Sequence, residues 1–244
     1  MIRASLPAGR PQIAPAVYAA VLSMVCIAAL LLRGRGAAFP PLINFGASHI
    51  ASSVGECLAR LLAMAQTVAV AAWAPWIGAP AARRAQAALG HGGLELTLFL
   101  LASLPIATAA WLAGGWDLNA MLGLYLTNGI LGAALAAAGA AATQLAFRRS
   151  RIGLLGLSAG CLLTLASARI TTDPLLTPAD ADATLAFVSP GYGLTLFFRG
   201  ADPFTPPPRS RDWLKHFAAL AAWGSLAGAV AWRAQSRAVS RPAS

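Results

Sequence analysis

The sequence predicts an all-α polytopic membrane protein with about six transmembrane helices. Apolar runs without a single charged residue recur along the chain. Charged residues make up only 11% of the 244 residues, against about 25% in soluble domains. With a mean hydropathy of +0.66, the chain has too few charges to cover the surface of a water-soluble protein.

The uncharged runs define the predicted spans, because a bilayer core is crossed by about 20 residues in helical form. They lie at 11–32, 61–80, 96–116, 118–147, 152–168 and 217–232. The first run is longer than the apolar core of a signal peptide, and basic residues follow it instead of a cleavage site. We therefore interpret it as a retained helix and the whole chain, 1–244, as one transmembrane domain.

Basic residues near the span ends predict the orientation, since Lys and Arg accumulate on the cytoplasmic side. The densest basic cluster, Arg148 to Arg151, directly follows the fourth run. Most basic residues on the other side belong to one long segment, where charge has less influence on topology. Although Arg33 and Arg35 argue for the opposite orientation, we predict that both termini are cytoplasmic. Abundant Ala and Arg with little Lys fits a GC-rich bacterial source, so we expect a multi-pass protein of the bacterial inner membrane.

The net charge of +10 does not indicate a nucleic-acid partner, because the basic residues form no stripe with interleaved aromatics. The sequence contains no P-loop, no GxGxxG and no HExxH pattern. The three cysteines and three histidines lack the spacing of metal ligands. We therefore expect no catalytic, cofactor or metal site in this chain.

One motif leaves two interpretations open. Residues Gly156 to Gly160 read Gly-Leu-Ser-Ala-Gly, which matches the GxSxG pattern of serine hydrolases. The motif lies inside a predicted span, where the strained turn of a hydrolase is out of place. It is also a GxxxG pattern for close helix contact, and Gly224 to Gly228 repeat it. Helix packing is the favoured interpretation, and an intramembrane serine protease using His216 is the alternative.

Polar side chains inside the predicted spans are candidates for a translocation path: Gln66, Tyr125, Asn128 and Gln144. Such side chains usually form hydrogen bonds between helices, which is the favoured interpretation, but they can also line a path for a polar substrate. No acidic or basic residue lies at the centre of a predicted span, which argues against a carrier coupled to protons or ions.

Two segments between the spans carry further expectations. Residues 81–89 are rich in alanine and follow Pro80, so they predict a short helix that the glycines at 90–93 would end. Residues 171–211 are rich in proline and acidic side chains and predict an external loop. Within that loop, we expect the apolar stretch 194–198 to contact the membrane interface.

Two spans joined by a short basic helix, with Gly93-Leu94-Glu95-Leu96 opening the next span, resemble the permease subunits of type-2 ATP-binding-cassette (ABC-2) transporters. In that family a Gly-Thr-Leu-Glu-Leu-Leu stretch and a proline follow the helix, and Pro105 is the counterpart here. The chain lacks the family's acidic residue near Arg83 and Arg84 and its hydroxyl residue after the glycine. Pro105 also lies further along the chain than in the family.

The resemblance implies a transmembrane permease subunit that is an exporter, because the family consists mostly of exporters. Two copies or paralogues would form the path, and a separate cytoplasmic ATPase subunit would hydrolyse ATP. The helix at 81–89 would dock on that ATPase, with coupling residues Arg83, Arg84, Gln86 and Glu95. The alternative from another class is a non-transporting scaffold or assembly subunit of a larger membrane complex. No charge pattern in the spans indicates a substrate.

Overall fold

The chain is helical in nearly all residues that its computed structural model describes, namely 17–24, 26–27, 54–78, 85–114, 118–145, 150–172, 192–201 and 208–239. The helices are α2 (Val54–Gly78), α3 (Ala85–Leu101), α4 (Leu104–Gly114), α5 (Leu118–Leu145), α6 (Ser150–Thr172), α8 (Tyr192–Ala201) and α9 (Ser210–Val239). The all-helical prediction is confirmed for this part of the chain.

Among the described residues, three stretches are long and apolar enough to cross a membrane: Leu58–Ile77, Gly93–Ala113 and Leu118–Thr143. They overlap the second, third and fourth predicted spans, so the prediction of transmembrane helices is confirmed. Helices α6 and α9 occupy the regions of the last two predicted spans, and α6 carries a shorter apolar stretch, Arg151–Leu163. The total of six spans stays a prediction.

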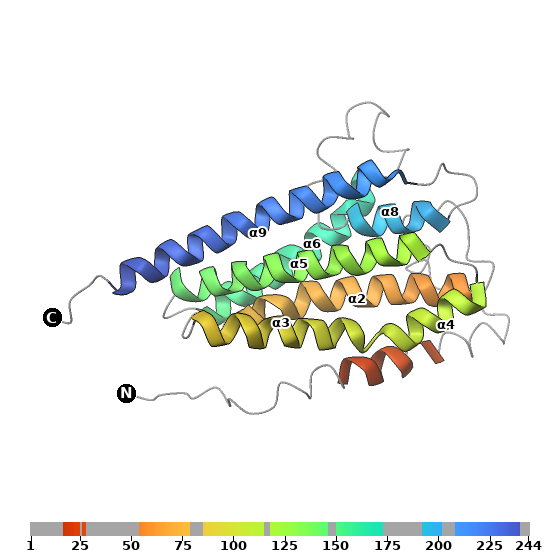
Figure 1. Cartoon of the computed structure of the whole chain (residues 1–244), viewed down its shortest axis with the longest axis horizontal. Coiled ribbons are helices and arrows are strands. Elements are labelled where there is room, and N and C mark those ends of the chain that lie inside the picture. Colours follow the sequence, from red (N-terminus) through yellow and green to blue (C-terminus); the bar gives the residue numbers. More distant parts are fainter. Residues whose placement is uncertain are drawn as a thin grey trace.

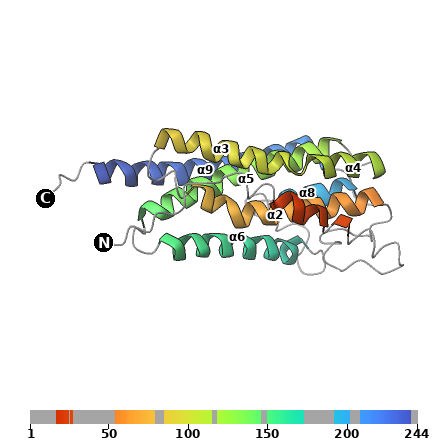
Figure 2. The same ribbon diagram turned by 90° about the horizontal axis from the view of Figure 1, so that it is seen from below.

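Helices α2 and α5 form the centre of the bundle. Helix α5 packs against α2, α3, α6, α8 and α9. Helix α6 lies on one side of this pair, and α3 with α4 lies on the opposite side (Figures 1 and 2). The helical residues 17–24 run beside α3 and α4, where the rings of Tyr18 and Phe99 stack with centroids 4.1 Å apart.

Glycines allow α5 to approach its neighbours closely. A Cβ atom on Gly139 would collide with the backbone of Pro75 in α2, and one on Gly123 would lie 2.8 Å from the indole of Trp213 in α9. Small residues at such contacts are typical of helix packing in membranes, where the hydrophobic effect does not drive helices together.

Gly139→Ala should lower the free energy of unfolding by about 1–3 kcal/mol, because the added methyl group meets backbone that cannot rotate away. Thermal unfolding of the purified chain in detergent measures the loss. Gly228→Ala is the matched control, since no described atom lies within 4 Å of its Cβ position. Equal destabilisation by both substitutions would contradict the proposed contact.

The predicted helix at 81–89 differs from the observed structure. Helix α3 begins at Ala85 and continues without interruption through Gly90, Gly92 and Gly93 to Leu101. In a membrane, each unpaired backbone group costs several kcal/mol, whereas a glycine costs a helix only about 1 kcal/mol. The three glycines therefore do not end the helix, and the residues from Ala85 continue directly into the apolar stretch Gly93–Ala113. Residues 81–84 lie outside the described part of the chain.

The external loop predicted at 171–211 is also corrected in part. Helix α6 extends to Thr172, α9 starts at Ser210, and α8 occupies Tyr192–Ala201 between them. The apolar side chains of Leu194, Leu196 and Phe197 in α8 are buried in the bundle. Residues 192–201 therefore form a helix that packs in the bundle, with its apolar side chains buried against α5, α2 and α9.

Candidate functional site: a polar layer in the core

The described apolar core consists of two clusters that are separated by polar side chains. On α2, Ala63 belongs to the first cluster and Val70 to the second, and Gln66 and Thr67 lie between them. Both polar side chains are at most 1% exposed. Polar residues therefore interrupt the apolar face of α2 where it is most deeply buried.

Helix α5 repeats this arrangement. Leu124 belongs to the first cluster and Leu131 to the second, and the polar residues Thr127 and Asn128 between them are buried. Tyr125, one turn before Asn128, is half-buried and packs against the first cluster.

Ser103 and His216 occupy the same level on two further elements. Fully buried Ser103 lies between Phe99 of the second cluster and Ala107 of the first. On α9, buried His216 lies between Trp213, which packs against the first cluster, and Leu220 of the second. The polar layer therefore consists of Gln66, Thr67, Ser103, Tyr125, Thr127, Asn128 and His216.

The polar layer lies at the middle of the three stretches that could cross a membrane, where a bilayer is least polar. Ser103 is at the middle of the stretch Gly93–Ala113, and Gln66 is near the middle of Leu58–Ile77. Asn128 is near the middle of Leu118–Thr143. Polar groups at this depth are costly, and they are often found where a membrane protein handles a substrate.

Ser103 joins three helices through its hydroxyl group. The hydroxyl donates to the Leu100 carbonyl at 2.7 Å, so its oxygen accepts from the Tyr125 hydroxyl at 2.8 Å. It also accepts from Gln66 Nε2 at 3.2 Å. Two of the predicted path residues, Gln66 and Tyr125, are thus brought together through a residue that the sequence analysis did not select.

The backbone at Ser103 is interrupted. Residues 102–103 form a turn between α3 and α4, and the Ser103 amide donates to Leu100, three residues back, at 3.2 Å. Pro105 has no N–H group to pair with the Leu101 carbonyl, and its ring disfavours a continuous helix. The span predicted at 96–116 as one helix is therefore two helices. Such breaks at membrane depth occur where protein or a hydrated cavity satisfies the freed backbone groups.

Ser103→Ala should destabilise the bundle by about 1–3 kcal/mol, because it leaves the Gln66 amide and the Tyr125 hydroxyl without their shared partner. Chemical or thermal unfolding in detergent measures this. Thr108→Ala on α4 is the control, since that exposed hydroxyl donates only to the Leu104 carbonyl of its own helix. A Ser103→Ala variant as stable as this control would contradict the bridging role.

Asn128 is the polar-layer residue whose burial most needs an explanation. It is 0% exposed, and neither its Nδ2 nor its Oδ1 atom has a hydrogen-bond partner in the described part of the chain. The same holds for Gln66 Oε1 and Thr127 Oγ1. Each unpaired buried group costs about 1–3 kcal/mol. These atoms offer two amide oxygens as acceptors, one amide nitrogen as a donor and one hydroxyl group that can do either, which suit an uncharged polar group or water.

Gly193 of α8 brings α5 and α9 together beside the polar layer. A Cβ atom at this position would collide with Thr127 and would lie 3.0 Å from Nε2 of His216. The rings of Tyr192 and His216 also meet at an angle of 63°, with centroids 5.7 Å apart. His216 is therefore fully buried among these helices, one residue before the predicted span 217–232 begins.

A buried ion pair lies nearer the start of α2. Arg60 Nη2 binds Glu56 Oε1, and the two side chains are 0% and 9% exposed. Arg60 lies one residue before the predicted span 61–80 and within the apolar stretch Leu58–Ile77. The i,i+4 spacing places both side chains on one face of α2, so that each neutralises the other.

Of the predicted ATPase-coupling residues, only the side chain of Glu95 is described by the structure. Arg83 and Arg84 lie outside the described residues, as do the side chains of Gln86 and Gln144. Glu95 is not at a corner between two helices. It lies within the continuous helix α3 and accepts a hydrogen bond from Trp73 Nε1 of α2 at 3.4 Å.

The GxSxG motif contacts α2 through its serine. Ser158 Oγ donates to the Ala72 carbonyl at 3.1 Å, whereas no described atom lies within 4 Å of a Cβ on Gly156 or Gly160. On α9, a Cβ atom on Gly224 would lie 3.2 Å from the Cβ atom of Ala134 in α5, whereas one on Gly228 would have no described atom within 4 Å. Within the described part of the chain, Gly156 and Gly160 therefore do not make the close helix contact that the GxxxG pattern predicts.

Comparison with known proteins returns no match among family models, curated sequences or solved structures.

Proposed function

We propose that this chain is the transmembrane permease subunit of an ATP-driven transporter, of the ABC-2 exporter class that its sequence resembles. The observation that supports this most is the buried polar layer at the middle of three apolar helices, with unpartnered amide groups beside an interrupted span. A purely structural bundle gains nothing from unpaired amides at that depth, whereas a path for a polar substrate needs such groups.

The mechanism follows from the continuity of α3. ATP would be hydrolysed on a separate cytoplasmic subunit, because the sequence has no nucleotide-binding motif. Movement of that subunit against Arg83 and Arg84 would act on the start of α3, which is a continuous helix as far as Leu101. The displacement would then reach the turn at Ser103 and change the hydrogen bonds to Gln66 and Tyr125. Two copies, or this chain and a paralogue, would enclose the path.

The proposal includes six spans with both termini in the cytoplasm of a bacterial inner membrane. In Figure 1 the end of α2, the start of α3, the end of α5, the start of α6 and the end of α9 lie at one end of the bundle. Exposed Arg151 and Arg233 are at this end. The positive-inside rule makes it the cytoplasmic end.

Affinity purification of the tagged chain in mild detergent tests the proposal. We expect a P-loop ATPase to co-purify in stoichiometric amount and to be lost when Arg83 and Arg84 are both replaced by Glu, because like charges would then face the docking surface. The matched control, Arg209→Glu with Arg211→Glu, changes the same charge at the other end of the bundle and should retain the ATPase. Retention by both double variants would contradict the coupling role.

The alternative is a non-transporting scaffold or assembly subunit. Gly156 and Gly160 on α6 favour it, because their small surfaces have no neighbour among the described residues and suit a helix of another chain. Co-purification of redox or secretion subunits without an ATPase would support the scaffold and contradict the transporter.

A further inference from the structure

A groove of about 450 Å³ opens between the first turns of α5 and α9. This volume falls in the range of about 300–1,000 Å³ that is typical of small-molecule sites. Leu122 and Leu126 of α5 form one apolar wall, and Leu214 and Phe217 of α9 form the other. Asn119 and Ser210 supply polar groups where the two helices begin.

The groove faces away from the bundle. Leu122 is 58% exposed, Leu126 46% and Leu214 65%, so these walls do not belong to either core cluster. In a chain whose α5 crosses a bilayer, apolar side chains exposed in this way lie against lipid. The apolar part of the groove is therefore open to acyl chains.

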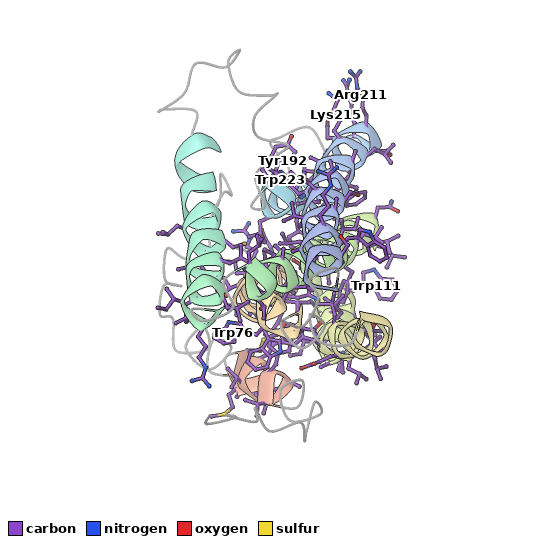
Figure 3. The ribbon with its side chains drawn as sticks, turned by 90° about the vertical axis from the view of Figure 1, so that its left-hand side faces the viewer. Trp76, Trp111, Tyr192, Arg211, Lys215 and Trp223 are labelled. Carbon is purple, nitrogen blue, oxygen red and sulfur yellow. The ribbon has the colours of Figure 1, made fainter. Side chains whose placement is uncertain are left out.

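Basic residues stand next to the polar end of the groove in the chain, although none of them lines the groove itself. Arg209 and Arg211 flank Ser210 in the chain, and both are exposed. Figure 3 shows Arg211 and Lys215 projecting away from the bundle at the start of α9. The carboxylate of Asp212 accepts a hydrogen bond from the Arg209 amide at 3.2 Å, so it caps the start of α9. The first turns of α5 and α9 add the positive ends of two helix dipoles.

We propose that this groove binds an anionic diacyl phospholipid. One acyl chain would lie between Leu122 and Leu214, and the phosphate would bind the guanidinium groups of Arg209 and Arg211. A second copy of the chain fits less well, because a symmetric interface places the same patch on both partners and would bring these arginines near their own counterparts. This inference is independent of the proposed transport function.

Native mass spectrometry of the full chain, titrated in detergent with phosphatidylglycerol or phosphatidylcholine, tests the proposal. Arg209→Gln with Arg211→Gln should weaken phosphatidylglycerol binding about 10- to 30-fold and phosphatidylcholine binding much less, because the choline cation offsets the charge of the phosphate that the arginines would bind. Arg233→Gln, an exposed arginine at the other end of α9, should have no effect. Leu126→Trp, which fills the groove, should weaken the binding of both lipids.

Three results would overturn the proposal. Unchanged phosphatidylglycerol binding in both the arginine and the Leu126→Trp variants would place the lipid elsewhere. Displacement of the lipid by an equal concentration of inorganic phosphate would show that the site binds an anion and does not recognise the acyl chains. A dimer that Leu126→Trp dissociates would identify the groove as an interface between copies. Thermal unfolding of each variant, measured in parallel, separates lost binding from lost folding.

Discussion

Arg60→Leu should lower the free energy of unfolding by about 3–5 kcal/mol, because it leaves the carboxylate of Glu56 buried without its ion-pair partner. Single domains are typically stable by about 5–15 kcal/mol, so this loss would remove much of the stability of the bundle. Unfolding of the detergent-purified chain, followed by far-UV circular dichroism, measures the effect.

The control for this prediction separates the charge from the shape of the side chain. Glu56→Gln together with Arg60→Leu removes both charges and should recover a large part of the loss, because replacing both members of a buried pair is often nearly neutral. Arg151→Leu, an exposed arginine at the start of α6, should change stability by less than about 0.5 kcal/mol. A mild effect of Arg60→Leu alone would show that water reaches the pair.

Asn128→Leu should raise stability by about 1–3 kcal/mol, because it removes a buried amide whose two polar atoms have no partner among the described residues. The two side chains are similar in volume, so little cavity or strain is expected. If the polar layer lines the substrate path, the same variant should retain its ATPase partner and lose substrate-stimulated ATP hydrolysis. Stability and activity are then expected to change in opposite directions.

Asn119→Leu is the matched control, since it makes the same substitution on α5 in the exposed first turn. We expect little change there in ATP hydrolysis. An Asn128→Leu variant that is less stable than the original chain would show that the amide is bonded within the protein and acts as a link between helices. Unchanged ATP hydrolysis would contradict a role in the path.

The long apolar helices could be predicted from sequence because length and lack of charge are local properties. The run at 118–147 has no charged residue, and α5 spans nearly the same residues. The position at which a helix ends depends on its surroundings as well as on the local sequence, as α3 shows. Glycines at 90–93 favour a helix end in water, but in a membrane the unpaired backbone groups of an interruption cost more than three helical glycines.

The polar layer was predicted only in part, because side-chain burial depends on how the helices pack. Gln66, Tyr125 and Asn128 were selected for their polarity inside spans. Ser103 was missed because small hydroxyl residues are common in such spans, although Pro105 nearby indicated a helix break.

His216 was considered only as the histidine of a possible protease and not as part of a buried polar layer. Its neighbour Lys215 suggested a span boundary, whereas the spacing of Trp213, His216 and Leu220 is that of one helix face. The spacing of Glu56 and Arg60 likewise indicates that their side chains lie on one face of a helix, since residues four apart on a helix are neighbours.

The central claim is that a polar substrate passes through the layer around Asn128. The most direct measurement is the reactivity of Asn128→Cys toward a membrane-impermeant thiol reagent, in a background where Cys26, Cys57 and Cys161 are replaced by Ala. We expect this cysteine to react and ATP to change its rate in the complex with the ATPase, while Leu131→Cys, one turn further on α5, stays unreactive. A cysteine at 128 that is unreactive in every nucleotide state would rule out a substrate path there and identify the polar layer as a contact between helices.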